Sequence, residues 1–410
     1  MNIAFDFITL YQPTGAGEYI RRIFFSFLDY LKLNNISDKN IFAVYDSSKG
    51  IYYEDMKRNA SFSVDVTFID VASFSSIDIA LSDYCMDTFF IGCAQYLGVY
   101  SRFERISCRV ICVVHDLSYE ESFYNNIQPF QVLTHPVFRQ ERLKQSPGWK
   151  LLLNPRSATM RYIRWYFSSR KNACWERDLT RIERVFGLLQ NNSQVRIIAV
   201  SEYTKNSIVF NFGISPDNIQ VLYSPERIFH SSSPLVINDR LKHFIDSRKK
   251  YYLMVSAGRI EKNAYKALKA FEQYAERNKD VYLLTIGYKH ELFPNHIDFD
   301  FLNDAELSLC YAHCYAFLYP SIFEGFGYPP IEAMHYKKPV LCSNVCSMPE
   351  VLGSAPIYFS PIYMSDIYRA LTILNDSNYA DYSIKSKLQY NLVKKRQEND
   401  LKTIIEIILS

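Results

Sequence analysis

Hydrophobic residues along this chain gather in short runs, and the stretches between the runs have hydrophobic positions at helical spacing. In the first half the runs predict strands at Ile3–Phe5, Ile41–Tyr45, Val66–Ile69, Phe89–Ile91, Val110–Val114, Ile197–Val200 and Ile219–Leu222. In the second half they predict strands at Tyr252–Val255, Val281–Ile286, Ala316–Tyr319, Val340–Cys342 and Ile357–Phe359. Helical faces are formed by Ile20, Ile23, Phe24, Phe27, Leu28 and Leu31, and later by Ala267, Leu268, Phe271 and Tyr274. Alternating strands and helices favour parallel α/β layers.

Length and polarity predict more than one domain. A chain of 410 residues exceeds what a single hydrophobic core usually supports, so two domains are expected. The polar segment from Pro225 to Arg248, which contains the run Ser231–Pro234, is the best candidate for a linker. The last stretch, Thr403–Leu409, is strongly apolar and is therefore expected to be buried.

Composition excludes several classes of protein. With 48% hydrophobic and 22% charged residues and a net charge of +3, the chain has the balance of an ordinary soluble protein and too little charge for a nucleic-acid binder. The acidic start Met1–Asp6 reads as a strand, not as a signal peptide, and no apolar run is long enough to span a bilayer. The nine cysteines are scattered, which indicates reduced thiols and a cytoplasmic location. Cys310 and Cys314 share a helical face with Leu307, which favours core packing over zinc binding.

The richest chemistry lies in the stretch Phe323–Met334, which follows the predicted strand Ala316–Tyr319. Glu324 and Glu332 bracket the turn Gly325-Phe326-Gly327 and a Pro-Pro pair. Pro330 suits the first position of a helix, because that position has no intrahelical use for a backbone N–H. Free N–H groups at such a turn suit phosphate, and the carboxylates can accept from sugar hydroxyls. The pattern therefore indicates a site for a nucleotide sugar.

The same stretch resembles glycosyltransferase family 4. Glu324 and Glu332 match the E-x7-E pattern of retaining enzymes. The longer match comprises Pro320, Ser321, Glu324–Gly327, Pro330, Glu332–Met334, Pro339, Val340, Pro349–Val351 and Gly353. The resemblance implies the GT-B architecture, in which two Rossmann-like domains face one another across a cleft. It places an acceptor domain at 1–226 and a nucleotide-sugar domain at 227–387, with a last helix, at about 388–410, that packs back on the first domain.

Two motifs of the first half lie where an open α/β sheet binds ligands, at the carboxyl ends of strands. Gly15 and Gly17 follow the first strand and resemble the family's N-terminal glycine loop, which approaches substrate. His115 and Asp116 follow Val110–Val114 directly. They resemble the His-Asp-Leu of family members that build bacterial surface polysaccharides, in which the histidine lies beside the transferred sugar. Asp116 is expected to orient the loop or the histidine.

A third motif follows the first strand of the second domain. Gly258, Arg259 and Lys262 resemble the family's Gly-Arg…Lys-Asn, with a spacing between the cations that is a residue or two shorter. Arginine can bind a diphosphate with its planar fork, and lysine can neutralise it as a point charge. The shorter spacing makes Arg259 the better supported of the two. Ser201, in a run similar to the family's serine-glutamate motif, is interpreted mainly as a helix N-cap.

The segment between Ser118 and Arg196 has no family motif. It contains basic residues interleaved with aromatics at 161–171, with Trp149 and Trp175 nearby. This composition suits contact with an anionic membrane on its inner face, or with a lipid-linked acceptor. An amphipathic helix that buries its aromatic residues explains the run equally well.

Together these features predict a retaining, metal-independent hexosyltransferase with no cofactor, of the kind that makes O-antigen. The resemblance assigns the diphosphate to Arg259 and Lys262, the transferred sugar to Glu324, and the ribose to Glu332. GDP-mannose is slightly favoured as the substrate over a UDP-sugar, and the acceptor is a polysaccharide or lipid-linked glycan. Two alternatives stay open: a nucleotide-sugar epimerase on the same frame, and a non-catalytic subunit that binds sugar nucleotides. A subunit that had lost catalysis would not need to keep both glutamates and both cations. This chain has all four, which argues against the second alternative.

Overall fold

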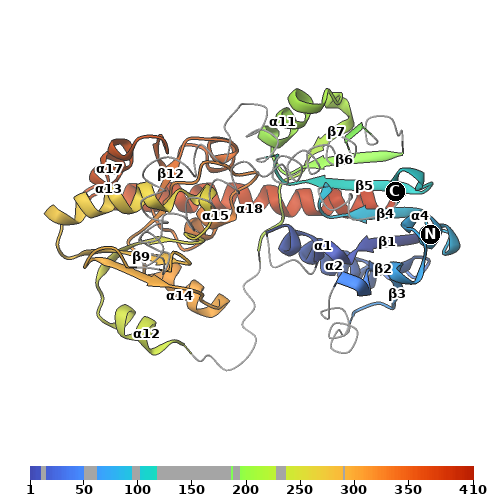
Figure 1. The fold of residues 1–410 in the computed structure, drawn as a ribbon, viewed down its shortest axis with the longest axis horizontal. Coiled ribbons are helices and arrows are strands. Elements are labelled where there is room, and N and C mark those ends of the chain that lie inside the picture. The colour runs from blue at the N-terminus through green and yellow to red at the C-terminus, as the bar shows by residue number, and fades with distance from the viewer. Residues whose placement is uncertain are drawn as a thin grey trace, which may run out of the picture.

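The computed structural model describes residues 1–10, 15–49, 62–94, 102–117, 186–187, 194–227, 237–289 and 291–410. Within these residues lie two parallel sheets. One has seven strands in the order β3-β2-β1-β4-β5-β6-β7, and the other has six in the order β10-β9-β8-β11-β12-β13. Each sheet, with the helices around it, forms one Rossmann-like domain, and the two domains lie side by side (Figure 1). The fold class predicted from the sequence is confirmed.

The N-terminal domain contains β1 (Asn2–Asp6), α1 (Phe7–Leu10), α2 (Gly15–Leu33), β2 (Asn40–Tyr45), η1 (Ser47–Lys49), β3 (Val66–Asp70), η2 (Val71–Ser73), α4 (Ile77–Asp83), β4 (Thr88–Ile91), η4 (Phe103–Arg105), β5 (Arg109–Val114), β6 (Val195–Ala199), α11 (Glu202–Phe212), η5 (Pro216–Asn218) and β7 (Ile219–Val221). The C-terminal domain contains α12 (Asp239–Asp246), β8 (Lys250–Met254), η6 (Ile260–Lys262), α13 (Ala264–Arg277), β9 (Val281–Ile286), β10 (His296–Phe299), α14 (Asp304–His313), β11 (Ala316–Tyr319), α15 (Tyr328–His335), β12 (Val340–Ser343), α16 (Met348–Leu352), β13 (Ile357–Phe359) and α17 (Met364–Ile373). The helix α18 (Tyr379–Leu409) ends the chain.

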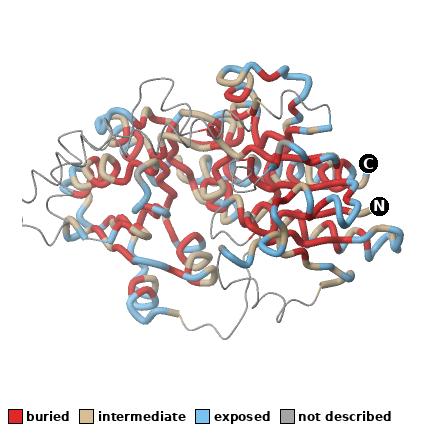
Figure 2. The backbone as a smooth tube through the Cα atoms, turned by 45° about the vertical axis from the view of Figure 1, so that its right-hand side comes forward, coloured by how far each residue is buried: buried red, intermediate tan, exposed pale blue. Residues whose placement is uncertain are grey.

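Every strand predicted from an apolar run is present, with ends that shift by at most two residues. The buried residues follow both sheets (Figure 2), because helices cover a parallel sheet on both faces. Helix α2 buries all six of its predicted core positions. Phe5 of β1 meets Phe24 of this helix edge to face, with ring centroids 5.1 Å apart.

Strand β10 was not predicted, because its sequence His296-Ile297-Asp298-Phe299 is half polar. Both polar side chains are buried against Thr285 of the neighbouring strand β9. The ring Nε2 of His296 lies 2.8 Å from the Thr285 hydroxyl, which donates in turn to the Asp298 carboxylate. Hydrogen bonding here replaces the apolar packing on which pattern recognition depends.

The predicted linker at Pro225–Arg248 is wrong over part of its length. Asp239–Asp246 forms the helix α12, which begins where the Asn238 side chain accepts from the backbone N–H of Arg240, 3.0 Å away. Leu241 and Phe244 bury its apolar face. The position of the domain boundary itself stays a prediction.

Helix α18 crosses from the C-terminal domain onto the N-terminal sheet, so that the two chain ends lie near one another (Figure 1). It begins at Tyr379, earlier than the predicted start near 388. The apolar stretch near its end is buried, as predicted, through Ile404, Ile405, Ile407 and Ile408. The Arg109 guanidinium of β5 donates to the Ile408 carbonyl at 3.0 Å. This bond gives a partner to a carbonyl at the C-terminal end of α18, where the helix carries partial negative charge. Among the described residues, no helix has the length and apolarity that crossing a membrane requires.

Candidate active site

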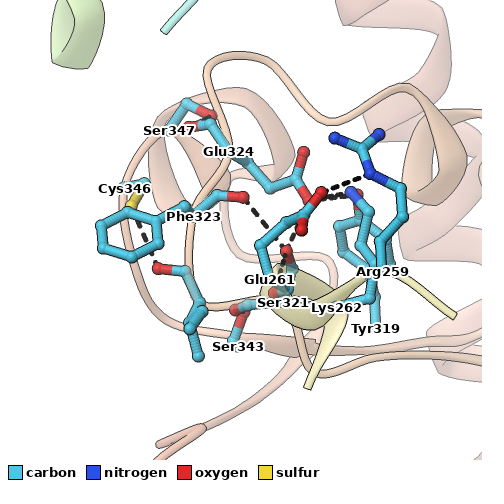
Figure 3. Close-up of polar contacts among 11 residues, drawn as sticks. Arg259, Glu261, Lys262, Tyr319, Ser321, Phe323, Glu324, Ser343, Cys346 and Ser347 are labelled. Carbon is cyan, nitrogen blue, oxygen red and sulfur yellow. Dashed lines mark hydrogen bonds and ion pairs between the residues drawn. The ribbon is translucent and has the colours of Figure 1, made fainter. Parts of the chain in front are cut away.

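The carboxylate of Glu324 lies in a group of donors just beyond the end of β11 (Figure 3). Its Oε1 accepts from the Tyr319 hydroxyl at 2.6 Å and from the Ser321 hydroxyl at 2.5 Å, and it forms an ion pair with Nζ of Lys262. The side chains of Lys262 and Glu324 are only 7% and 12% exposed. None of these three bonds uses Oε2, so the second carboxylate oxygen can serve another partner.

The two predicted cations occupy different environments. Lys262 ends the short helix η6, whose turn is closed by the bond from its own N–H to the Arg259 carbonyl, at 3.1 Å. Its side chain is directed inward to Glu324. The Arg259 side chain is 65% exposed and pairs with Glu261 (Figure 3). The structure thus brings Lys262 to the glutamate and leaves Arg259 at the surface. The assignment of both cations to a diphosphate stays a prediction.

Glu332 lies on α15 and is also held by two groups. Its Oε2 accepts from the Tyr311 hydroxyl at 2.8 Å, and its Oε1 is 3.4 Å from Nη1 of Arg227. Burial raises the pKa of Glu332 above its ordinary value, and the charge of Arg227 and the Tyr311 bond oppose that rise. Nη2 of Arg227 also pairs with Asp304, at 2.8 Å.

Sequence reasoning missed the groups that hold the two glutamates. Tyr311 and Tyr319 resembled core aromatics, and Ser321 was noted only as part of a longer motif. Arg227 stands in a polar segment that looked like a linker. Tyr319 and Ser321 are near Glu324 in sequence. Tyr311 and Arg227 are distant from Glu332 in sequence, so only the fold reveals their contacts with it.

Helix α15 begins at Tyr328, two residues before the predicted start at Pro330. Gly327 precedes it with a φ of 84°, a left-handed conformation that glycine adopts without strain. A Cβ on Gly327 would also lie 2.2 Å from Cε of Met348. Because the first turn of a helix needs no intrahelical N–H donors, Pro329 and Pro330 fit within it.

The glycine turn touches the N-terminal domain through Gly325. A Cβ at this position would lie 1.7 Å from the His115 carbonyl oxygen, so only glycine permits the approach. The Gly325 carbonyl accepts from the Ser201 hydroxyl at 2.7 Å, and the His115 carbonyl accepts from the Thr204 hydroxyl at 3.1 Å. Ser201 also caps α11 by accepting from the Thr204 N–H, which confirms its structural role. The His-Asp-Leu and E-x7-E motifs are therefore in direct contact.

The His115 ring is held by the backbone of Gly92. Its Nε2 lies 2.7 Å from the Gly92 carbonyl, an acceptor, so Nε2 carries a proton, and Nδ1 is the acceptor when the ring is neutral. Burial lowers the pKa of His115, although the bond to Gly92 and the charge of Asp116 act in the opposite direction. Tyr19 of α2 packs edge to face on the ring at 4.8 Å. Asp116 also lies at the contact with Gly325, whose added Cβ would be 3.0 Å from the Asp116 Cβ.

The remaining predicted site residues are Gly15, Gly17, Gly258 and Phe326. Gly15 faces α15, where its Cβ would meet the Tyr328 ring at 3.9 Å, and Gly17 is buried in α2. Gly258 lies so close to Gly287 that a Cβ would be 2.1 Å from the Gly287 carbonyl oxygen. The Phe326 side chain is buried, with Tyr223 and Tyr328 at ring distances of 5.1 Å and 5.5 Å. The Phe326 side chain is therefore part of the packing between the domains, and the predicted substrate contact of this residue, through its backbone amide, stays a prediction.

Two further predictions concern metal and membrane. Cys310 and Cys314 are buried in the core, as predicted. Across the described ranges, no cluster of three or more histidine, cysteine or acidic side chains could hold a metal ion. The aromatic and basic run at 161–171, with Trp149 and Trp175, lies outside the described residues.

Two Rossmann-like domains side by side are the architecture of GT-B glycosyltransferases, and the E-x7-E turn lies where the two domains meet. Residues 237–357 match the family described as glycosyl transferases group 1. The resemblance to glycosyltransferases is thereby confirmed over the C-terminal domain.

Known proteins extend this similarity over more of the chain. The chain is 24% identical over 314 residues to the serotype-specific mannosyltransferase WbdA of Escherichia coli, which covers 73% of this chain and 34% of that protein. It is 29% identical over 177 residues to the O-antigen chain mannosyltransferase RfbU of Salmonella typhimurium, which covers 40% of this chain and 46% of that protein. The matches thus span about a third to a half of these relatives. HepE from Anabaena, solved with UDP and glucose, shares the fold with a TM-score of 0.63 over 100% of both chains, at 13% identity.

Proposed function

We propose that this protein is a retaining glycosyltransferase that moves a hexose, with mannose the first choice, from a nucleotide-diphosphate sugar to a polysaccharide or lipid-linked glycan. The observation that carries the proposal is the pair of hydrogen-bonded carboxylates of the E-x7-E motif: Glu324, which is paired with the buried cation Lys262, and the buried Glu332, which is held by Tyr311 and Arg227. The mannosyltransferase relatives support the choice of sugar. GDP-mannose is the proposed substrate, and a UDP-sugar is the second choice.

Catalysis in this proposal depends on the charge that builds on the leaving diphosphate. Lys262 and Arg259 stabilise that charge as the bond between sugar and phosphate breaks. The Lys262 ammonium is paired with Glu324, and this pair fixes the position of the charge in the site. Glu324 holds the transferred sugar through its second oxygen, and Glu332 accepts from the ribose hydroxyls.

The N-terminal domain supplies the acceptor side in this proposal. His115 and Gly325 touch, so the histidine lies next to the turn that would hold the sugar. As a neutral ring with Nδ1 as acceptor, His115 can receive a hydrogen bond from a sugar hydroxyl. Gly15 and Gly17 would let the acceptor approach the start of α2, and Asp116 would keep the loop in place.

The reaction itself is the test. The purified protein is offered a panel of GDP- and UDP-sugars with a lipid-linked or oligosaccharide acceptor, and the products are read by proton NMR. The proposal expects a glycoside with the same anomeric configuration as the sugar nucleotide. An inverted product contradicts the retaining mechanism. A changed sugar nucleotide that forms without acceptor indicates an epimerase, and binding without turnover of any sugar indicates a non-catalytic subunit.

The last two parts of the proposal concern the need for a divalent ion and the location of the enzyme in the cell. The reaction needs no divalent ion, because protein cations stand at the diphosphate. The enzyme works in the cytoplasm, at the inner face of the plasma membrane. The basic run at 161–171 is the proposed contact, and reversing its charges should abolish binding to anionic vesicles while sparing the binding of sugar nucleotide.

A further inference from the structure

Arg227 joins the segment between the two sheets to the buried carboxylate of the proposed ribose site. It lies between β7 and α12. Its Nη1 is 3.4 Å from Oε1 of Glu332, and its Nη2 is 2.8 Å from Oδ1 of Asp304. The guanidinium is 28% exposed and the Glu332 carboxylate 7%, so this ion pair is largely withdrawn from water.

The other groups around Glu332 are neutral or acidic. Tyr311 and Asp304 face it from α14, and Tyr328 lies near it on α15. Glu18 of α2 is close enough to act on both Arg227 and Tyr328, and it is paired with Arg21. Of the charged groups in the described part of the chain that affect Glu332, Arg227 is positive and Asp304 is negative.

We propose that Arg227 is a positioning residue that keeps Glu332 ionised and oriented so that both of its oxygens can accept hydroxyl groups of a ribose. The inference rests on the proposed function, which assigns ribose to Glu332. Arg227 contacts one oxygen and Tyr311 the other, so each oxygen keeps a lone pair for a ligand. Protonation would turn one of these acceptors into a donor.

Loss of this cation has a consequence that depends on pH. Burial already raises the pKa of Glu332, and Arg227 opposes the rise. Replacing Arg227 by methionine, which keeps much of the length without the charge, should raise that pKa further. Glu332 would then take up a proton at a higher pH, and nucleotide binding would weaken as the pH falls through that range. If Arg227 had only a structural role, Arg227→Met would weaken binding equally at every pH.

The test measures binding of GDP and of UDP by titration calorimetry from neutral to mildly acidic pH, with the parent as the reference at each pH, because the terminal phosphate of both probes takes up a proton at about pH 6. Relative to the parent, Arg227→Met should lose affinity by about tenfold for each pH unit below the new pKa. Arg227→Lys, which keeps the charge, should restore most of the parent profile. Tyr311→Phe, which removes a neutral donor, should weaken binding with a much smaller effect on the pH profile.

A double-mutant cycle with Glu332→Gln isolates the pair. Glu332→Gln should bind nucleotide weakly, and adding Arg227→Met to it should not change the pH profile of Glu332→Gln. A profile of Arg227→Met parallel to that of the parent would overturn the inference, as would an effect of Arg227→Met on the pH profile that persists without the Glu332 carboxylate. If Arg227→Met does not fold, a parent-like profile of Arg227→Lys with a shifted profile of Arg227→Gln decides in favour, and equal profiles decide against. Failure of the parent to bind either nucleotide would instead contradict the proposed function.

Discussion

The ammonium of Lys262 and the carboxylate of Glu324 form an ion pair that is almost entirely buried at the end of β11, with the Tyr319 hydroxyl bonded to both at 2.9 Å and 2.6 Å. A buried pair of this kind depends on both partners, since either charge alone would be left without compensation in a poorly solvated position. The pair thus links the stability of the C-terminal domain to the proposed chemistry.

Replacing Lys262 by methionine should lower both stability and activity. Breaking a buried ion pair by removing one partner costs about 3–5 kcal/mol, so the melting temperature should fall markedly. The double variant Lys262→Met with Glu324→Gln should recover much of the stability but none of the activity. Thermal melts and steady-state kinetics on the three proteins check this, and a full recovery of turnover in the double variant would remove both residues from the mechanism.

Replacing Arg259 by alanine should lower activity and leave stability almost unchanged. Its side chain is exposed, so the melting temperature should hardly change. If the guanidinium meets the diphosphate in the transition state, kcat/KM should fall by a factor equivalent to roughly 2–4 kcal/mol. Glu261→Gln, which removes the partner of Arg259, is the matched control and should leave kcat/KM within a few fold. Parent-like kinetics of Arg259→Ala would exclude it from the phosphate site.

Gly325→Ala should disturb the contact between the domains. The added Cβ would lie 1.7 Å from the His115 carbonyl oxygen, so the turn or the end of β5 must move. We expect a large loss of turnover and a lower melting temperature. Gly15→Ala is the control for stability, because its Cβ would meet the Tyr328 ring at an ordinary 3.9 Å. Equal melting temperatures for Gly325→Ala and the parent would show that the two motifs are not held in contact in solution.

Acid should destabilise the protein through His296. Burial lowers the pKa of His296 from 6.5 to about 4, so in this interval the unfolded chain takes up a proton that the folded chain does not. Stability is therefore kept above the ordinary histidine pKa and is lost as the pH falls toward the folded value. Urea melts of the parent and of His296→Gln across this range check the assignment. The parent should lose stability more steeply, and parallel curves would contradict it.

Much of the fold could be predicted because its strands are buried on both faces and read as apolar runs. Strand β10 could not, because His296 and Asp298 are buried by hydrogen bonds to Thr285. In the site, the motif located Glu324 and Glu332, while spacing ranked Arg259 above Lys262. The structure adds that Lys262 is buried and Arg259 exposed. This difference depends on which side chain the turn of η6 directs inward, and sequence spacing does not predict it.

The most direct test of the account is full saturation kinetics with the sugar nucleotide on Glu332→Gln and Glu324→Gln, with folding checked by melting temperature. Ribose contacts are the same in the bound substrate and in the transition state, so Glu332→Gln should chiefly raise KM. Glu324 lies nearer to the sugar on which charge develops, so Glu324→Gln should chiefly lower kcat, by about ten- to a thousandfold. A loss of kcat in Glu332→Gln together with a loss of affinity alone in Glu324→Gln would contradict these roles.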